Sequence, residues 1–162
     1  MKFLALLVMA FALNTEATIY NSKAIVHPEV GKNGMVVSQH YLATNAGHSI
    51  LAEGGNAYDA SIAVAFALAV VLPRAGNIGG GGFMVMFDEA SQESYSIDYR
   101  EIAPEAATKN MFLASDGSVD KKRATQGVLS IGVPGTVYGM WEVHKKFGSL
   151  PWSTLLAPAI EL

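Results

Sequence analysis

The sequence has no cysteine, and charged residues make up only 15% of its 162 positions. Without cysteine the chain can form no disulfide, no thiol nucleophile and no cysteine-ligated zinc site. The formal net charge is −3, and no basic face stands out. Binding to nucleic acid or to an anionic membrane surface therefore has no electrostatic support.

Nucleotide-binding motifs are missing as well, although four consecutive glycines, Gly79–Gly82, precede an apolar segment. A P-loop requires a Lys directly after its last glycine, but Phe83 stands there. The GxGxxG fingerprint would need a third glycine at Met84, and it belongs between a strand and a helix. A nucleotide-binding domain is therefore disfavoured, and a strand that begins where another backbone crowds it explains the run better.

No nucleophile–base arrangement is visible either. The four histidines, none of them in an HExxH motif or at metal-ligand spacing, are His27, His40, His48 and His144. Ser38, Ser61 and Ser130 lack the GxSxG elbow of serine hydrolases. We expect these histidines to be structural, and we expect no catalytic residue, metal site or cofactor in this chain.

The N-terminus has the outline of a secretory signal peptide. Lys2 is followed by eleven apolar residues, 3–13, which are too few to span a bilayer. We predict a signal peptide over residues 1–17, cut near Ala17 with Ala12 as a rival site, and a periplasmic or secreted protein without stable membrane insertion. An ordinary buried N-terminal helix is the alternative. Residues 18–162 are then one domain or part of one.

The hydrophobic pattern predicts an α+β chain. The expected elements are a strand at 35–38, helices at 40–53 and 57–72, strands at 83–88 and 95–100, a loop-rich segment at 104–127, and helices at 136–147 and from about 150 to the end. Gly54 and Gly55 are expected to end the first helix, and Asn56 with Asp59 to begin the second. Lys121–Lys122–Arg123 is expected in a solvated loop.

Three of these elements carry further expectations. The helix at 57–72 is apolar on nearly every face, so it should be buried in the core. The strand at 83–88 is continuously apolar and should be central, with its hairpin partner half-buried. The last helix ends without a polar tail, which favours a chain that is the front piece of a longer protein. The residues of that helix expected to lack partners are Leu155, Leu156, Ile160 and Leu162. The stripe expected to be buried on the helix at 136–147 is Val137, Met140, Trp141 and His144.

Arg100 is the one candidate binding residue. It ends a strand that alternates with period two, so it should lie on the face opposite Ile97 and Tyr99. A guanidinium fixed beside the Pro104 loop could bind a substrate carboxylate with two hydrogen bonds. The alternative is a weak surface ion pair between Arg100 and Asp98 or Glu101.

Four stretches together resemble the γ-glutamyltransferase (γ-glutamyl transpeptidase, glutathione hydrolase) family. They are "AEGGNAYDASIAVAFALAVVLP", "GNIGGGGFMVMF", "IDYREIAPEAA" and "GVPGTVYGMWEVHKKFGSLPWSTLLAPAIEL". The likeness runs from about Gly34 to Leu162 in family order. It implies the N-terminal portion of the large subunit of an N-terminal-nucleophile hydrolase with an αββα sandwich, made as a proenzyme that cuts itself into two subunits.

The resemblance also implies a reaction. The N-terminal Thr of the small subunit, which this sequence lacks, attacks the γ-glutamyl amide of glutathione and related substrates. The resulting γ-glutamyl-threonine ester is passed to water or to an amino acid or peptide. Arg100 matches the Arg of the family's D-[FY]-R-E-x-A-P motif, whose role is to bind the α-carboxylate of the γ-glutamyl group. The implied partners are the rest of the large subunit and the small subunit, and this chain alone should be inactive.

Two further hypotheses accompany this one. The chain could instead be a non-catalytic module that binds γ-glutamyl compounds or a partner. The glycines Gly80 and Gly81 could serve as structural support, letting the start of their strand lie close to the chain that builds the glutamyl pocket.

Overall fold

The computed structural model describes residues 30–162. The predicted signal peptide, residues 1–17, and His27 lie outside the described residues. The chain divides into two units, of which the second, Asn33–Leu162, is compact. The second unit holds all the helices and strands described below. None of these helices is long and apolar enough to cross a membrane.

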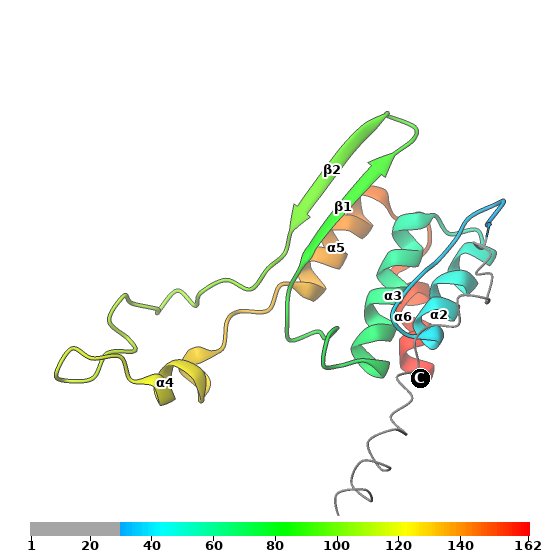
Figure 1. The fold of residues 1–162 in the computed structure, drawn as a ribbon. Helices are drawn as coiled ribbons and strands as arrows, with labels where there is room; N and C mark the ends of the chain where they lie inside the picture. The colour runs from blue at the N-terminus through cyan, green and yellow to red at the C-terminus, as the bar shows by residue number, and fades with distance from the viewer. Residues whose placement is uncertain (1–29) are drawn as a thin grey trace, which may run out of the picture. The chain divides into compact units, whose positions relative to one another are not determined.

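Figure 1 shows the order of the elements along the second unit. They are α2 (Tyr41–Ala52), α3 (Ala57–Val71), β1 (Phe83–Asp88), β2 (Glu93–Asp98), α4 (Lys121–Thr125), a 3-10 turn (Val128–Ser130), α5 (Thr136–Phe147) and α6 (Trp152–Glu161). The long helices and both strands confirm the predicted elements to within about two residues. The predicted strand at 35–38 is wrong, because this segment pairs with no other strand among the described residues.

The junction between α2 and α3 follows the predicted capping chemistry. Gly54 adopts a φ of +90°, a conformation that glycine tolerates best, just after the end of α2. The Asn56 side chain accepts hydrogen bonds from the N–H groups of Tyr58 and Asp59, both at 2.9 Å. The Asp59 carboxylate accepts the Asn56 N–H at 3.1 Å, which completes a capping box. The sharp turn between the two helices is therefore encoded locally.

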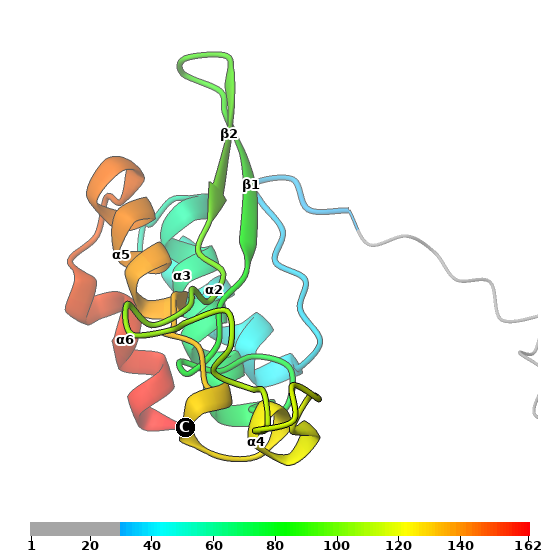
Figure 2. The ribbon, with the colours of Figure 1, turned by 90° about the vertical axis from the view of Figure 1, so that its left-hand side faces the viewer.

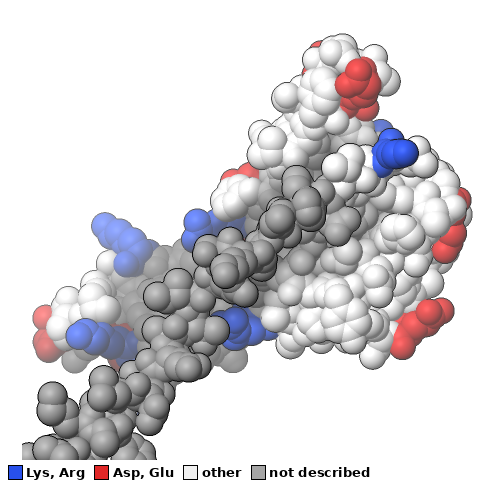
Figure 3. Space-filling view, turned by 45° about the vertical axis from the view of Figure 1, so that its right-hand side comes forward, with Lys and Arg blue, Asp and Glu red and all other residues white. Residues whose placement is uncertain are grey.

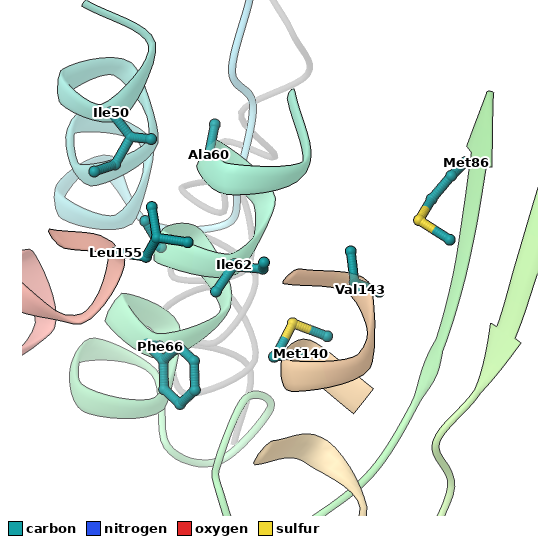
Figure 4. Close-up of a cluster of buried hydrophobic side chains, with 9 residues drawn as sticks. Ile50, Ala60, Ile62, Phe66, Met86, Met140, Val143 and Leu155 are labelled. Carbon is teal, nitrogen blue, oxygen red and sulfur yellow. The ribbon is translucent and has the colours of Figure 1, made fainter. Parts of the chain in front are cut away.

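Helix α3 is the centre of the core, as its apolar sequence predicts. It packs against α2, α5 and α6, and its buried side chains include Ile62 and Phe66. Figure 4 shows how Met140 and Val143 of α5 fill the space between α3 and Met86 of β1. Together these contacts join helices and hairpin in one apolar cluster, and burial of such side chains is the main stabilising contribution.

The two strands form an antiparallel hairpin, with Phe83 opposite Asp98 and Asp88 opposite Glu93. One face packs on the helices through Met84, Met86 and Ile97 (Figure 2). The other face carries Phe83, Val85 and Phe87, which are 64%, 82% and 56% exposed. The expectation that β1 is a central strand is therefore wrong within the described residues, because only one of its two apolar faces is covered.

Three smaller expectations also need correction. Lys121–Lys122–Arg123 is exposed, but it forms the start of α4 rather than a loop, because Asp120 caps that helix by accepting the Arg123 N–H. The buried residues of α5 are Gly139, Met140 and Val143, whereas Val137 and Trp141 are 45% and 41% exposed. Leu155 of α6 is fully buried in the core cluster and Leu156 is half-buried against it, so both have partners, while Ile160 and Leu162 are exposed. On the side shown in Figure 3, acidic and basic side chains are scattered over a mostly uncharged surface.

Candidate functional site

Arg100 lies just beyond the end of β2, on the exposed side of the chain. Its backbone N–H donates a hydrogen bond to Oδ1 of Asp98 at 2.9 Å. The expected alternative, an ion pair with Asp98 or Glu101, is not formed: the one ion pair among the described residues joins Lys145 to Glu142. No acidic side chain among residues 30–162 pairs with the Arg100 guanidinium, so it is available to bind a carboxylate.

The glycine run lies directly against the backbone of Arg100. A Cβ added to Gly81 would lie 2.6 Å from the carbonyl oxygen of Tyr99 and 2.7 Å from Cα of Arg100. The N–H of Tyr99 donates to the carbonyl of Gly82 at 2.9 Å. Real Cβ atoms essentially never come within 3.0 Å of such atoms. The glycine run therefore does lie close to another backbone segment, as expected, and that segment is the one that carries Arg100.

A second set of glycines, which the sequence analysis missed, covers the same residues from α5 and the segment before it. A Cβ on Gly135 would lie 1.9 Å from the Tyr99 carbonyl oxygen, and one on Gly139 would lie 2.3 Å from Cγ of the Tyr99 ring. A Cβ on Gly132 would lie 2.9 Å from Cβ of Glu101. The available signal was "GVPGTVYG", in which Gly135 and Gly139 are spaced about one helical turn apart.

Hydrogen bonds hold the two glycine segments together. The carbonyl of Gly80 accepts the N–H groups of Gly135 and Thr136 at 2.9 and 3.1 Å. Ile102 and Val133 exchange two backbone hydrogen bonds, at 3.3 and 2.8 Å. The segment from Tyr99 to Ile102 is therefore held on both sides by main-chain contacts that leave no room for side chains at the glycines.

The aromatic ring of Tyr99 faces the helices. It packs against the apolar core cluster, and its burial raises the pKa of the phenol above the ordinary value. Side chains alternate along the extended chain, so Arg100 points away from the helices when Tyr99 points toward them. A shallow depression of about 330 Å³ adjoins this place and is lined by Gly80, Gly81, Tyr99, Glu101 and Thr136 among others, but not by Arg100.

The other candidate residues do not converge. Nδ1 of His40 accepts the Leu42 N–H at the start of α2, and Nε2 of His144 donates to the Leu150 carbonyl at 2.8 Å. Both histidines therefore have structural roles, as expected. Among residues 30–162, no three His, Asp or Glu side chains are grouped so that they could hold a metal ion.

Comparison with known proteins places this geometry in a family. Residues 43–162 match the protein-family model described as Gamma-glutamyltranspeptidase. A glutathione hydrolase proenzyme from Pseudomonas aeruginosa is 50% identical over 127 residues, which cover 78% of this chain and 22% of that protein. The solved γ-glutamyltranspeptidase of Helicobacter pylori superposes with a TM-score of 0.79 at 51% identity, covering 84% of this chain and 39% of that one.

The γ-glutamyltranspeptidase of Pseudomonas nitroreducens, solved as a complex with L-DON, gives a TM-score of 0.76 at 48% identity over 82% of this chain and 39% of that one. The chain therefore belongs to the γ-glutamyltranspeptidase family. The predicted fold class, part of an N-terminal-nucleophile hydrolase, is confirmed by the same similarity. The chain spans about a quarter of the length of the curated relatives it matches.

Proposed function

We propose that this chain is the N-terminal portion of a γ-glutamyltransferase precursor, and that it supplies the residue that binds the α-carboxylate of the γ-glutamyl group. Two facts about the relatives support this. They are named glutathione hydrolase proenzymes, and the chain covers 22% to 25% of three of them. Its share of the two solved chains is larger, 39% in each, as expected if those chains are pieces of a cleaved precursor.

In this proposal the catalytic group lies outside the chain. The N-terminal Thr of the small subunit attacks the carbonyl carbon of the γ-glutamyl amide, and its own amine takes the hydroxyl proton. The amide C–N bond breaks, the proton passes to the leaving amine, and a γ-glutamyl ester remains. Water or an amino acid then attacks that ester and regenerates the Thr hydroxyl. Arg100 would hold the donor's α-carboxylate at a fixed distance from the reacting carbonyl.

The geometry of Arg100 is the single observation that carries its role. A guanidinium has five N–H donors in a rigid plane that matches a carboxylate with two parallel hydrogen bonds. Here that plane has no ion-pair partner among the described residues, and it extends from a backbone held on both sides. A lysine at the same place would keep the charge and lose the two-pronged geometry.

Two steps test the proposal. Sequencing the coding region past codon 162 should reveal a long continuation with an internal Thr at a self-cleavage point. In the full-length protein, Arg100→Lys should raise KM for a γ-glutamyl donor about tenfold to a hundredfold, the loss of one charge-assisted hydrogen bond of about 1.5–3 kcal/mol. Arg74→Lys is the matched control, since Arg74 is also exposed. Equal activity of Arg100→Lys and the parent at low donor concentration would refute the role of Arg100.

We further propose that the signal peptide at residues 1–17 directs the protein to the periplasm or out of the cell. The sequence pattern of a charged start and a short apolar segment supports it. N-terminal sequencing of the mature protein should give a chain that begins at Thr18. A mature chain that retains Met1 would refute this proposal.

A further inference from the structure

We propose that Tyr99 is the positioning residue for Arg100: its ring and its carbonyl fit against bare glycine backbone from two distant segments, and this fit sets the direction of the guanidinium. The glycines concerned are Gly81 and Gly82 before β1, and Gly135 and Gly139 at the start of α5. The inference rests on the proposed function, because it explains how the carboxylate anchor is oriented.

The first part of the fit concerns the aromatic ring. Cγ of Tyr99 would lie 2.3 Å from a Cβ on Gly139, and its ring atoms would lie 3.0 to 3.2 Å from a Cβ on Gly82. The ring therefore packs directly against the backbone at Gly82 and at Gly139, and it also contacts the apolar core. A ring enclosed in this way cannot change its position unless α5 or the start of β1 also moves.

The second part concerns the backbone. The Tyr99 carbonyl oxygen would lie 1.9 Å from a Cβ on Gly135 and 2.6 Å from one on Gly81, so glycine lies on two sides of it. The carbonyl of Gly80 accepts two N–H groups from the start of α5, which fixes the spacing between these sides. The peptide plane that joins Tyr99 to Arg100 is thus held in one orientation.

These contacts bear on the guanidinium through the chain direction at Arg100. An ordinary Cβ contact begins near 3.4 Å, so a methyl group on Gly139 would push the Tyr99 ring by about 1 Å. Displacements of about 1 Å in a positioning residue can lower a reaction rate by about a hundredfold, because paired hydrogen bonds depend on alignment. The predicted effect of such a change falls on recognition of the α-carboxylate.

The experiment compares two donors in the full-length enzyme. One is a γ-glutamyl anilide, and the other is the matching 4-aminobutanoyl anilide, which differs only by lacking the α-carboxylate. The ratio of kcat/KM for these donors measures carboxylate recognition, and loss of folded enzyme lowers both values equally. We expect Gly139→Ala to lower the ratio at least tenfold, with KM for the γ-glutamyl donor rising and kcat changing less than threefold.

Gly79→Ala is the matched control, because a Cβ on Gly79 would meet only Oδ1 of Asn77, at an ordinary 3.5 Å. This variant should leave the ratio within twofold of the parent. Tyr99→Leu leaves both glycine segments intact and removes the ring, so it should lower the ratio even where Gly139→Ala prevents folding. The double variant Gly139→Ala/Tyr99→Leu should lower the ratio no more than the more damaging of the two single variants does, since both changes disturb the same contact.

The results separate the two proposals. If Arg100→Lys lowers the ratio but Gly139→Ala and Tyr99→Leu reduce both donors equally, Tyr99 is only structural and the positioning inference is overturned. If Arg100→Lys leaves the ratio unchanged, the anchor role itself is overturned. A fall in the ratio for all three variants, with Gly79→Ala unaffected, supports both.

Discussion

Replacing Asp59 is the strongest test of how the helical part of the fold is held together. Asp59 is fully buried near the start of α3. Besides the Asn56 N–H, its carboxylate accepts the N–H of Ser149 at 3.2 Å, the Ser149 hydroxyl, and the N–H of Leu150 at 3.3 Å. Asp59 therefore links the turn between α5 and α6 to the start of α3, about ninety residues earlier in the sequence.

The cost of Asp59→Ala follows from these contacts. Hydrogen bonds to a charged group contribute about 1.5–3 kcal/mol each when buried, but Ser149 is exposed, so water can replace part of that loss. We therefore expect a destabilisation of about 3 kcal/mol. In a chain of this size that loss lowers the melting temperature by about 6–12 °C. Asp59→Asn should cost less than Asp59→Ala, because the amide oxygen can still accept some of these hydrogen bonds. Its NH2 group cannot accept from the remaining donors, so part of the loss persists.

Urea unfolding followed by circular dichroism would measure the change in the free energy of unfolding. Glu105→Ala is the control, because it removes the same charge from an exposed position with no hydrogen bond among the described residues. The control should unfold within about 0.5 kcal/mol of the parent. If Asp59→Ala were equally mild, the buried carboxylate would not hold the α5–α6 turn, and the reasoning would fail.

Two further predictions concern the pH dependence of stability that Tyr99 causes and the binding of a free carboxylate by Arg100. Burial raises the pKa of Tyr99 in the folded chain above its ordinary 10.0, so its contribution to stability is complete below pH 10 and is lost as pH rises through the raised pKa. Tyr99→Phe should therefore lose less stability than the parent in urea titrations above pH 10, and an unchanged alkaline profile would contradict the burial argument. Tyr58 and Tyr95 also have raised pKa values and should retain part of the pH dependence. L-glutamate titrated calorimetrically into this chain alone should show no saturation below about 100 mM, because the exposed Arg100 contributes only about 0–1 kcal/mol to binding a carboxylate. Saturable binding at millimolar concentration would favour the non-catalytic module.

The sequence predicted the elements whose signals are local. The Asn56–Asp59 capping box, the glycine after α2 and the apolar length of α3 were all readable, because each depends on residues within one or two helical turns. The face of α5 was predicted correctly at Met140 but wrongly at Val137 and Trp141, for a physical reason. Pattern analysis counts apolar side chains, but α5 approaches Tyr99 through Gly139, which has none. The buried face therefore includes a residue that such a count ignores.

The same limit explains the outcome at β1 and at the candidate site. An apolar strand predicts two covered faces, but the sequence does not say which residues cover the face of Phe83, Val85 and Phe87. Arg100 was singled out by its position at a strand end, which is a local feature, and by the family motif that it matches, and its binding role stays a prediction. The contacts of Gly135 and Gly139 with Tyr99 join positions about 40 residues apart, which no periodicity encodes.

The exposure of Arg100 bears on where binding energy for a γ-glutamyl group can arise. A solvent-exposed guanidinium–carboxylate pair contributes only about 0–1 kcal/mol, because water competes for both partners and their side chains lose freedom. The same pair strengthens several-fold where other groups exclude water from it. A rigid backbone at Tyr99 and Arg100 reduces the entropy lost on binding, but it cannot remove that water. The anchor should therefore become effective only in a site that further protein encloses, which agrees with its proposed place in a longer precursor.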